Sequence, residues 1–329
     1  MHVIDRYASL QHYADHTDAV WLALPEDARG ASWAPSRSIR GAECWNPVTA
    51  AQTGAQRLLV ASWPDAVSAA GRGRDLVYLE HGAGQSYDGD PAMAGAAGWS
   101  GARARGLEGV RLFLCPNETV ARRWRELHDV PAVAVGCPKL DPWHAGARPA
   151  PERPAVAITF HWDCPLGPET RSAWSWWDRA LPELVQWCRR QGVEVLGHGH
   201  PRLWSRIARR WASLGVEPVE RLADVLDRAT VLVADNTSAL YEFASLDRPV
   251  VVLNAPWYRR DVEHGLRFWS HVPGDQVNHR GLLVPAVEQA LADPGATAEL
   301  RAAATAAAYA ACDGQAAARA ATAILEAMP

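Results

Sequence analysis

The alternation of short β-rich runs with longer helical patterns constrains the fold of this chain more than any other feature. Between the β-rich runs, segments such as 176–191 and 204–214 carry apolar residues at three- and four-residue spacing. This alternation is typical of a parallel sheet covered by helices on both faces, the α/β class. The predicted strands span 19–24, 57–62, 75–80, 111–115 and 132–135 in the first half and 155–160, 193–196, 231–234 and 250–253 in the second.

A linker-like stretch separates the two series of strands. Residues 144–154 contain one glycine and three prolines, a composition typical of connections rather than of helices or strands. A chain of 329 residues is long enough for two domains that each bury a core. We therefore predict one domain over 1–150 and a second over 151–283.

The C-terminal segment is rich in alanine and other strong helix formers. We predict a helical tail over 284–329. Connections between neighbouring elements are usually short, so we expect the tail to pack on the second domain. The alternative is a tail that crosses back to the first domain.

Charge, cysteine spacing and hydropathy narrow the class of protein. A net charge of −4 gives no global positive field to collect nucleic acid or anionic membranes. The six cysteines form no CxxC pair, so neither a zinc ribbon nor a thioredoxin-type site is indicated. No stretch approaches the ~20 apolar residues of a membrane span, and the N-terminus lacks a signal-peptide pattern. We predict a cytoplasmic protein with no integral membrane segment.

One segment of the second half has the composition of a phosphate-binding turn. The predicted strand 231–234 is followed by Asp235, Asn236, Thr237 and Ser238 and then by a helical pattern. A helix N-terminus presents unpaired N–H groups and partial positive charge, so hydroxyls beside it can form a phosphate cradle. The same residue types also cap ordinary helices, and that simpler interpretation stays open.

Two histidines follow the preceding strand of the second half. His198 and His200 alternate with glycines, which allow close approach of a ligand, and Pro201 stops the strand. The spacing would suit a pair of metal ligands, but no third ligand lies at metal-site spacing, so we predict no bound metal. An imidazole that donates to an anionic phosphate is the preferred function, and a structural polar loop is the alternative.

A histidine also ends a strand of the first half. His81 follows the predicted strand 75–80 and precedes Gly82 and Gly84, which leave the imidazole uncovered. Such a histidine is suited to take a proton from an attacking hydroxyl at neutral pH. Asp88 and Asp90 lie near enough in sequence to orient it.

Taken in order, four segments resemble the CDP-glycerol glycerophosphotransferase family of teichoic-acid polymerases and primases. His81-Gly82 is similar to the family's Trp-His-Gly-Thr turn, and His200-Pro201 is similar to its His-Pro motif. The segment from Gly136 to Asp141 is similar to Gly-x-Pro-Arg-x-Asp, and residues 234–238 are similar to Thr-Asp-Tyr-Ser-Ser. The resemblance extends over residues 75 to 270.

The resemblance implies a fold and a set of roles. It implies a GT-B fold, in which two Rossmann-like domains face each other across a cleft, the first on the acceptor side and the second binding the nucleotide donor. It implies that His81 is the base that activates an acceptor hydroxyl and that His200 is a second catalytic residue, with no metal or other cofactor. The donor diphosphate would be bound by Asn236, Thr237 and Ser238 with His200, and the supporting residues would be Gly82, Gly84, Gly136, Lys139, Asp141, Asp235 and Pro201.

The chain departs from the family pattern at several positions. Glu80 stands where the family has tryptophan, Ala83 where it has threonine, Lys139 where it has arginine and Asn236 where it has tyrosine. The substrate therefore need not be that of the family. We predict transfer of a glycerol-phosphate or glycosyl group from a nucleotide-diphosphate donor to an acceptor hydroxyl. The acceptor is left open among a polymer, a lipid-linked saccharide and a modified nucleobase.

Three other functions remain open. A UDP-sugar 2-epimerase would have the same fold and need no acceptor, and an inactive nucleotide-binding scaffold would bind nucleotide without turnover. A DNA-base-modifying glycosyltransferase would need a surface for nucleic acid, for which a basic aromatic helix face is the candidate. The alternative for that helix is a solvated surface with tryptophans directed into the core. The residues concerned are Arg202, Arg206, Arg209 and Arg210 with Trp204 and Trp211.

Overall fold

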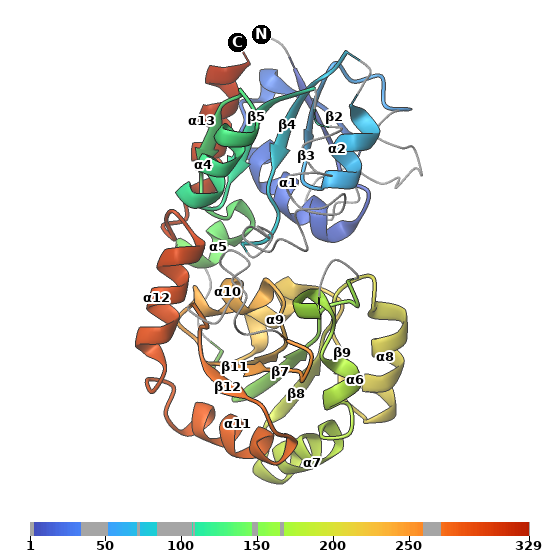
Figure 1. Cartoon of the computed structure of the whole chain (residues 1–329), viewed down its shortest axis with the longest axis vertical. Helices are drawn as coiled ribbons and strands as arrows, with labels where there is room; N and C mark the ends of the chain where they lie inside the picture. The colour runs from blue at the N-terminus through green and yellow to red at the C-terminus, as the bar shows by residue number, and fades with distance from the viewer. Residues whose placement is uncertain are drawn as a thin grey trace. The chain divides into compact units, whose positions relative to one another are not determined.

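The computed structural model describes residues 3–33, 52–70, 73–83, 107, 109–146, 151–164, 168–258 and 271–328. It divides the chain into two compact units (Figure 1). The first unit comprises Met1–Ala147 together with Ala308–Pro329, and the second comprises Arg148–Ala307. The division falls close to the predicted boundary at residue 150. Within the described ranges, no helix is long and apolar enough to cross a membrane.

The first unit is built on a six-stranded parallel sheet with the strand order β2-β1-β3-β4-β5-β6. The strands are β1 (Ile4–Tyr7), β2 (Arg29–Trp33), β3 (Arg57–Val60), β4 (Asp75–Leu79), β5 (Val110–Cys115) and β6 (Ala132–Ala134). The helices are α1 (Gln11–Ala23), α2 (Trp63–Ala69), α4 (Glu118–Leu127), α5 (Asp141–His144) and α13 (Ala316–Ala327).

Successive residues of the central strand β4 point to opposite faces of this sheet. Val77 and Leu79 belong to the core cluster that α1 and α13 complete. Tyr78, between them, packs against Phe113 and Trp124, whose rings stack with centroids 4.2 Å apart. Alternation along a strand that is buried on both faces produces this near-continuous apolar run. The sheet is therefore covered on both sides, as the sequence pattern predicts.

The second unit has a sheet of the same kind, with the strand order β12-β11-β10-β7-β8-β9 and parallel pairing throughout. The strands are β7 (Ala155–Thr159), β8 (Glu194–Gly197), β9 (Glu217–Pro218), β10 (Val231–Ala234), β11 (Val250–Leu253) and β12 (Asp275–Val277). The helices are α6 (Trp174–Trp177), α7 (Leu181–Gln191), α8 (Trp204–Ser213), α9 (Leu222–Arg228), α10 (Ala239–Ala244), α11 (Leu283–Ala292) and α12 (Ala298–Ala308).

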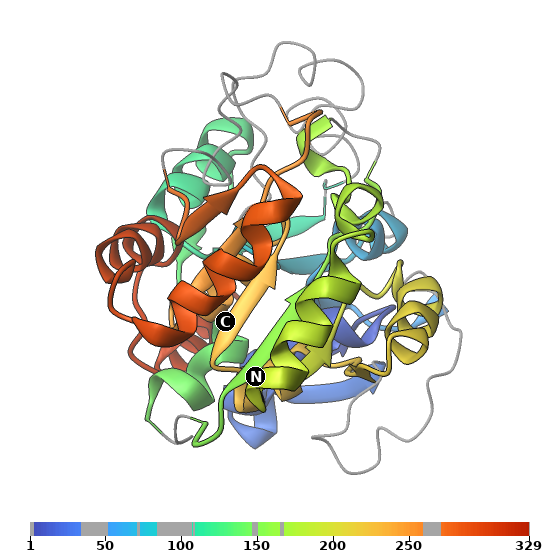
Figure 2. The same ribbon diagram turned by 90° about the horizontal axis from the view of Figure 1, so that it is seen from below.

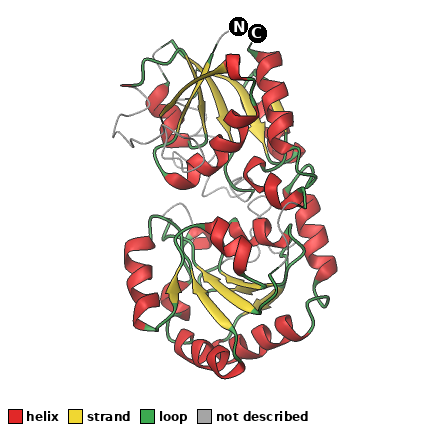
Figure 3. Cartoon of the chain, turned by 180° about the vertical axis from the view of Figure 1, so that it is seen from behind, coloured by secondary structure: helices red, strands yellow, loops and turns green. Residues whose placement is uncertain are grey.

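The order of these strands reverses between β7 and β10. The chain runs outward through β7, β8 and β9, returns to the other side of β7, and runs outward again through β10, β11 and β12. In Figure 2, α7 and α11 lie side by side across one face of the sheet. In Figure 3 the strands of each unit, in yellow, lie between red helices. Ligands of open α/β sheets bind outside the carboxyl ends of the strands at such a switch point.

One predicted strand is wrong. Residues 19–23 lie in helix α1, and Leu24 follows its C-terminus. Their apolar run belongs to a longer helical pattern that buries Tyr13, Thr17, Val20 and Trp21. A short apolar run cannot by itself distinguish a buried strand from part of a helix. Strands β1, β2, β9 and β12, which are short or partly polar, were not predicted.

The predicted tail is helical, but it is divided between the two units. Helices α11 and α12 belong to the second unit, whereas α13 belongs to the first. The carboxylate of Asp141 accepts hydrogen bonds from the backbone N–H groups of Ala316 and Ala317, at 3.0 and 2.7 Å, and so caps the N-terminus of α13. The expectation that the whole tail packs on the second domain thus differs from the structure.

Candidate functional site

Polar residues follow four adjacent strands of the second unit, β8, β7, β10 and β11, at their carboxyl ends. Parallel strands end at the same edge of a sheet, so these residues gather around the switch point between β7 and β10. They are His161 after β7, His198 and His200 after β8, Asp235, Asn236, Thr237 and Ser238 after β10, and Asn254 after β11.

Asp235 ties the turn after β10 to the segment after β7. Its side chain is fully buried, and its Oδ1 accepts a hydrogen bond from the backbone N–H of His161 at 2.7 Å. Its Oδ2 accepts one from the backbone N–H of Ala173 at 2.8 Å and one from the hydroxyl of Ser172 at 3.3 Å. Hydrogen bonds to a carboxylate are stronger than neutral ones, so Asp235 is a structural anchor of this edge.

The three residues after Asp235 form a tight turn rather than a long capped helix. Asn236 and Thr237 are buried, Ser238 is half-buried, and α10 has six residues. The hydroxyl of Ser238 makes no capping hydrogen bond to α10, which leaves it available to a ligand. The predicted polar turn is therefore present, but the short helix contributes less to anion binding than the sequence argument assumed.

His200 is half-buried and lies beside His161, a residue that the sequence did not lead us to predict. The backbone N–H of Arg202 donates to Nδ1 of His200 at 3.1 Å, so in the neutral ring the proton is on Nε2 and Nε2 is the donor. The rings of His161 and His200 meet edge to face with centroids 5.3 Å apart. His161 donates from Nδ1 to the carbonyl of Thr170 at 3.0 Å. The sequence feature that could have indicated His161 is its position directly after the predicted strand 155–160.

His198 and its flanking glycines serve packing rather than ligand approach. His198 is buried, with Nδ1 2.6 Å from Oγ1 of Thr159. A Cβ at Gly197 would lie 2.3 Å from the Trp211 ring, and one at Gly199 would lie 2.8 Å from Ile207. The glycines are thus required because α8 packs closely against them. The structure thus gives these two glycines a packing role, whereas the sequence argument had assigned them to the approach of a ligand. Pro201 is exposed, and its carbonyl accepts the Trp204 N–H at the start of α8.

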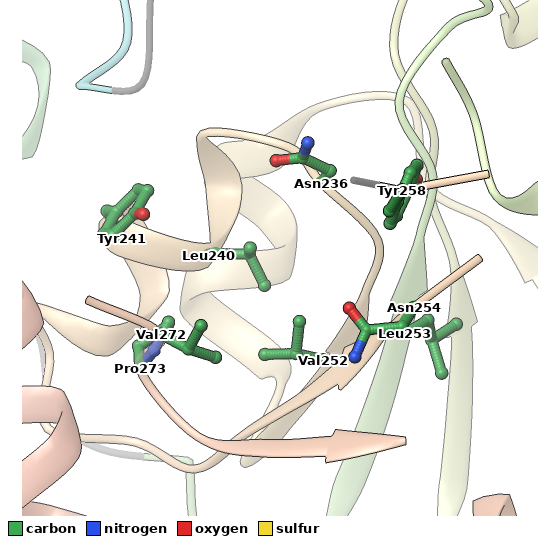
Figure 4. Close-up of a pocket in the computed structure, with 9 residues that line it drawn as sticks. All are labelled: Asn236, Leu240, Tyr241, Val252, Leu253, Asn254, Tyr258, Val272 and Pro273. Atoms are coloured by element: carbon green, nitrogen blue, oxygen red, sulfur yellow. The ribbon is translucent and has the colours of Figure 1, made fainter. Parts of the chain in front are cut away.

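A pocket opens beside the turn after β10. Figure 4 shows Asn236 above it and Tyr258 at one side, with apolar side chains below. Its lining residues come from the turn after β10, α10, the end of β11 with the segment after it, and the segment before β12. They are Asn236, Leu240, Tyr241, Val252, Leu253, Asn254, Tyr258, Val272 and Pro273. Because Asn236 lines it, the pocket lies directly beside the predicted phosphate-binding residues.

In the first unit, His81 faces a group of aromatic rings on α1. Its ring meets Tyr13 edge to face at a centroid distance of 4.6 Å, and the rings of His12 and His16 lie at 6.2 and 6.3 Å. His81 itself is half-buried at the carboxyl end of β4, and Gly82 follows it with φ of +82°, a conformation that favours glycine. The sequence reading missed His12 and His16, although their spacing of four residues places them on one helix face.

The segment from Gly136 to Asp141 has two separate roles in the first unit. Gly136 has φ of +91°, and a Cβ there would lie 2.9 Å from the carbonyl oxygen of Ala311. Gly136 therefore lies directly against the C-terminal segment, which Asp141 also holds by capping α13. Lys139 is half-buried and lies close enough to His16 to affect its protonation. The segment therefore joins the C-terminal helix to the neighbourhood of His81.

His16 is held neutral by its surroundings. Burial, followed by the charges of Lys139, His81 and His12, lowers the pKa of His16 well below its ordinary value of 6.5. The unfolded chain takes up a proton at His16 near 6.5, whereas the folded chain resists it. The stabilisation is therefore complete above pH 6.5 and is lost as the pH falls below that value.

We expect this loss to reach about 1.4 kcal/mol per pH unit below the unfolded pKa of His16. The measurement is urea unfolding of the wild type and of His16→Gln at about pH 7.5 and about pH 5.5, a range that spans the expected loss. The variant should lose less stability on acidification than the wild type. An equal loss in both proteins would show that His16 is not the group responsible.

Some predicted residues lie outside the described part of the chain. They are Gly84, Asp88 and Asp90. Among the residues that the structure describes, no three His, Cys, Asp or Glu side chains group as metal ligands.

The basic aromatic helix proposed for nucleic acid is α8. Trp211 is fully buried against Gly197, and Arg210 donates to Asp178 at 2.7 Å. Arg206 lies over the ring of Trp174 at 4.6 Å. A buried tryptophan cannot stack on a base. The structure thus favours a solvated helix whose tryptophans face the core, the alternative given above.

Comparison with known structures identifies the fold. A variant of the wall teichoic acid polymerase TagF has a TM-score of 0.66 and 11% identity, over 99% of this chain and 88% of that chain. The UDP-GlcNAc 2-epimerase from Neisseria meningitidis has a TM-score of 0.55 and 12% identity, over 100% and 99%. MnaA of S. aureus with UDP has a TM-score of 0.59 and 13% identity, over 97% and 94%. The two α/β units and helical C-terminal region define a GT-B fold, as predicted.

The sequence profile of the CDP-glycerol:poly(glycerophosphate) glycerophosphotransferase family matches residues 182–326. The predicted resemblance to the CDP-glycerol glycerophosphotransferase family is thus confirmed, and group transfer is the class of reaction that it indicates. No curated protein matches the chain in sequence. The matched region contains His200, the turn from Asp235 to Ser238, and Asn254, whereas His81 lies before it.

Proposed function

We propose that this protein transfers a glycerol-phosphate or glycosyl group from a nucleotide-diphosphate donor to an acceptor hydroxyl. The observation that carries the proposal is the meeting of His161, His200 and the turn from Asp235 to Ser238 at the switch point of the second sheet. Such a point is where open α/β sheets bind their ligands. The family profile, which matches His200 and the turn, supports a phosphate-bearing donor.

The donor diphosphate is proposed to bind to Asn236, Thr237, Ser238 and His200. The Nε2–H of His200 donates to a phosphate oxygen, since its Nδ1 already accepts from the backbone. The hydroxyl of Ser238 donates to another. These groups are positioned by a rigid edge, so they can stabilise the charge that develops on the leaving nucleotide.

His81 is proposed to act as the base. Its imidazole takes the proton of the acceptor hydroxyl while that oxygen forms a bond to the transferred phosphorus or carbon. The bond to the nucleotide breaks at the same time, and its electron pair leaves with the nucleotide's phosphate oxygen. The proposal includes no metal or other cofactor, so the charge of the leaving group falls to the residues of the second unit.

The acceptor is proposed to be a hydroxyl of a polymer or of a lipid-linked saccharide. The modified nucleobase is set aside because α8 offers no exposed aromatic pair for nucleic acid. The proposed location is the cytoplasm. Cys115, Cys137, Cys164 and Cys188 are buried free thiols, as suits a reducing compartment.

A panel of nucleotides tests the proposal. Thermal unfolding is measured with CDP, UDP, GDP, ADP, CDP-glycerol and common nucleotide sugars, since a ligand that binds only the native state raises its apparent stability. A shift with one nucleotide class would identify the donor. Absence of a shift with all of them would contradict a nucleotide-dependent transferase.

The epimerase is the second candidate, favoured by the fold shared with the Neisseria meningitidis enzyme. Incubation of the protein with a UDP-sugar and no acceptor separates the two. Isomerisation of the sugar would establish the epimerase, and turnover that requires an acceptor would establish the transferase. Binding without either reaction would indicate an inactive scaffold.

Replacement of Ser238 by alanine is expected to weaken donor binding by about 10- to 100-fold, because it removes a hydroxyl partner of a charged phosphate. Calorimetric titration with the nucleotide found in the panel measures this. Ser245→Ala is the matched control, since that hydroxyl lies at the far end of α10 and donates to the carbonyl of Glu242 at 2.8 Å. Unchanged affinity in Ser238→Ala would mean that the phosphate binds elsewhere.

A further inference from the structure

Asn254 is the residue that directly follows β11, and its backbone is held from two sides. Its N–H donates to the carbonyl of Val277 at 3.0 Å, and its own carbonyl accepts the indole N–H of Trp177 at 2.8 Å. The residue is 3% exposed. The backbone of Asn254 is therefore held in place, and its side chain lines the pocket shown in Figure 4.

The amide of Asn254 has one orientation. Its Nδ2 donates to Oε1 of Gln276 at 3.1 Å and to Oδ1 of Asn278 at 2.8 Å, so both amide hydrogens are used. The carbonyl oxygen Oδ1 must then point the other way. In Figure 4 it points toward the space that Leu240, Val252 and Tyr258 border.

This oxygen is buried and accepts no hydrogen bond from the residues that the structure describes. Native proteins rarely leave a buried polar atom without a partner, and such an atom often marks a functional position. A bound ligand with an N–H or O–H group at this point would satisfy it.

The rest of the pocket restricts what that ligand is. Leucine, valine and proline side chains and the rings of Tyr241 and Tyr258 form most of its lining. A glycerol or sugar has several hydroxyl groups, and each would need a partner that apolar walls do not supply. A planar heterocycle instead buries two apolar faces and needs partners only at its edge.

We propose that Asn254 reads the nucleobase of the donor, with its Oδ1 accepting a hydrogen bond from an N–H group on the base edge. The inference rests on the proposed function, because the base is then carried by the nucleotide whose phosphates bind beside Asn236. Asn236 lines the same pocket. Cytosine offers its exocyclic amine and uracil its ring N–H to this oxygen.

Base methylation tests the inference on the unaltered protein. Affinities are measured by calorimetry for CDP and UDP and for their analogues N4,N4-dimethyl-CDP and 3-methyl-UDP, which lack these N–H donors. Methylation is expected to weaken binding of the preferred nucleotide about tenfold or more, since a buried acceptor loses its partner. Asn254→Ala should bind the parent nucleotide about tenfold more weakly, and methylation should cost it nothing further.

Gln289→Ala is the control, because Gln289 is exposed on α11 and is not one of the residues that line the pocket. It should keep the preference for the unmethylated base. Equal affinity of parent and methylated nucleotides for the wild type would overturn the inference and leave the proposed function standing. Failure of the wild type to bind any of CDP, UDP, GDP and ADP would overturn both.

Discussion

Replacement of His81 by alanine is expected to lower turnover by about 10²- to 10⁴-fold while leaving nucleotide affinity nearly unchanged. A general base acts on the acceptor hydroxyl, and it makes no contact with the donor in the proposed mechanism. His81 lies in the first unit, whereas the donor-binding residues lie in the second. The measurement compares the turnover number of the variant with its calorimetric affinity for the nucleotide.

His279→Ala is the matched control for this prediction. His279 is exposed, and its Nδ1 accepts only a weak hydrogen bond from Gly281 at 3.3 Å within the described structure. The control should turn over at the wild-type rate. Turnover that is unchanged in His81→Ala would remove His81 from the mechanism, whereas a matched loss of nucleotide affinity would show a structural defect instead.

The sequence predicted the strands that are buried on both faces. The runs that became β10 and β11 are apolar throughout, and those that became β4 and β7 are apolar except for Asp75 and Thr159 at their ends, which is the pattern of central parallel strands. The run 19–24 misled the prediction because a helix that packs on a sheet has an apolar stripe of similar composition. The edge strands β2, β9 and β12 are exposed on at least one face, so their residues carry little strand signal.

The candidate site was predictable where a motif ends a buried strand. Asp235 to Ser238 follow β10 and His200 follows β8, and the parallel pairing of β8 with β7 and of β7 with β10 brings these ends to one edge. His161 follows β7 in the same way, but no motif distinguished it. The sequence also could not show that Gly197 and Gly199 face Trp211 and Ile207, because that depends on how α8 packs on the sheet.

The Asp235 carboxylate explains why a turn of small polar residues can form a rigid site. A short turn has no hydrophobic core of its own, and the buried six-residue helix after it holds the turn at its C-terminal end alone. Its geometry must therefore come from a connection to a neighbouring element. The three hydrogen bonds that Asp235 accepts from His161, Ser172 and Ala173 supply that connection, and they fix His161 and the turn in one arrangement.

Replacement of Asp235 by alanine is thus expected to destabilise the second unit by at least about 3 kcal/mol, because it leaves two buried backbone N–H groups without an acceptor. Donor binding should fall with it. Urea unfolding and nucleotide titration measure the two effects. Asp178→Ala is the control, since its one-third-exposed carboxylate makes an ion pair with Arg210 and should cost about 1 kcal/mol or less. Similar losses in both variants would mean that the Asp235 hydrogen bonds do not hold the site together.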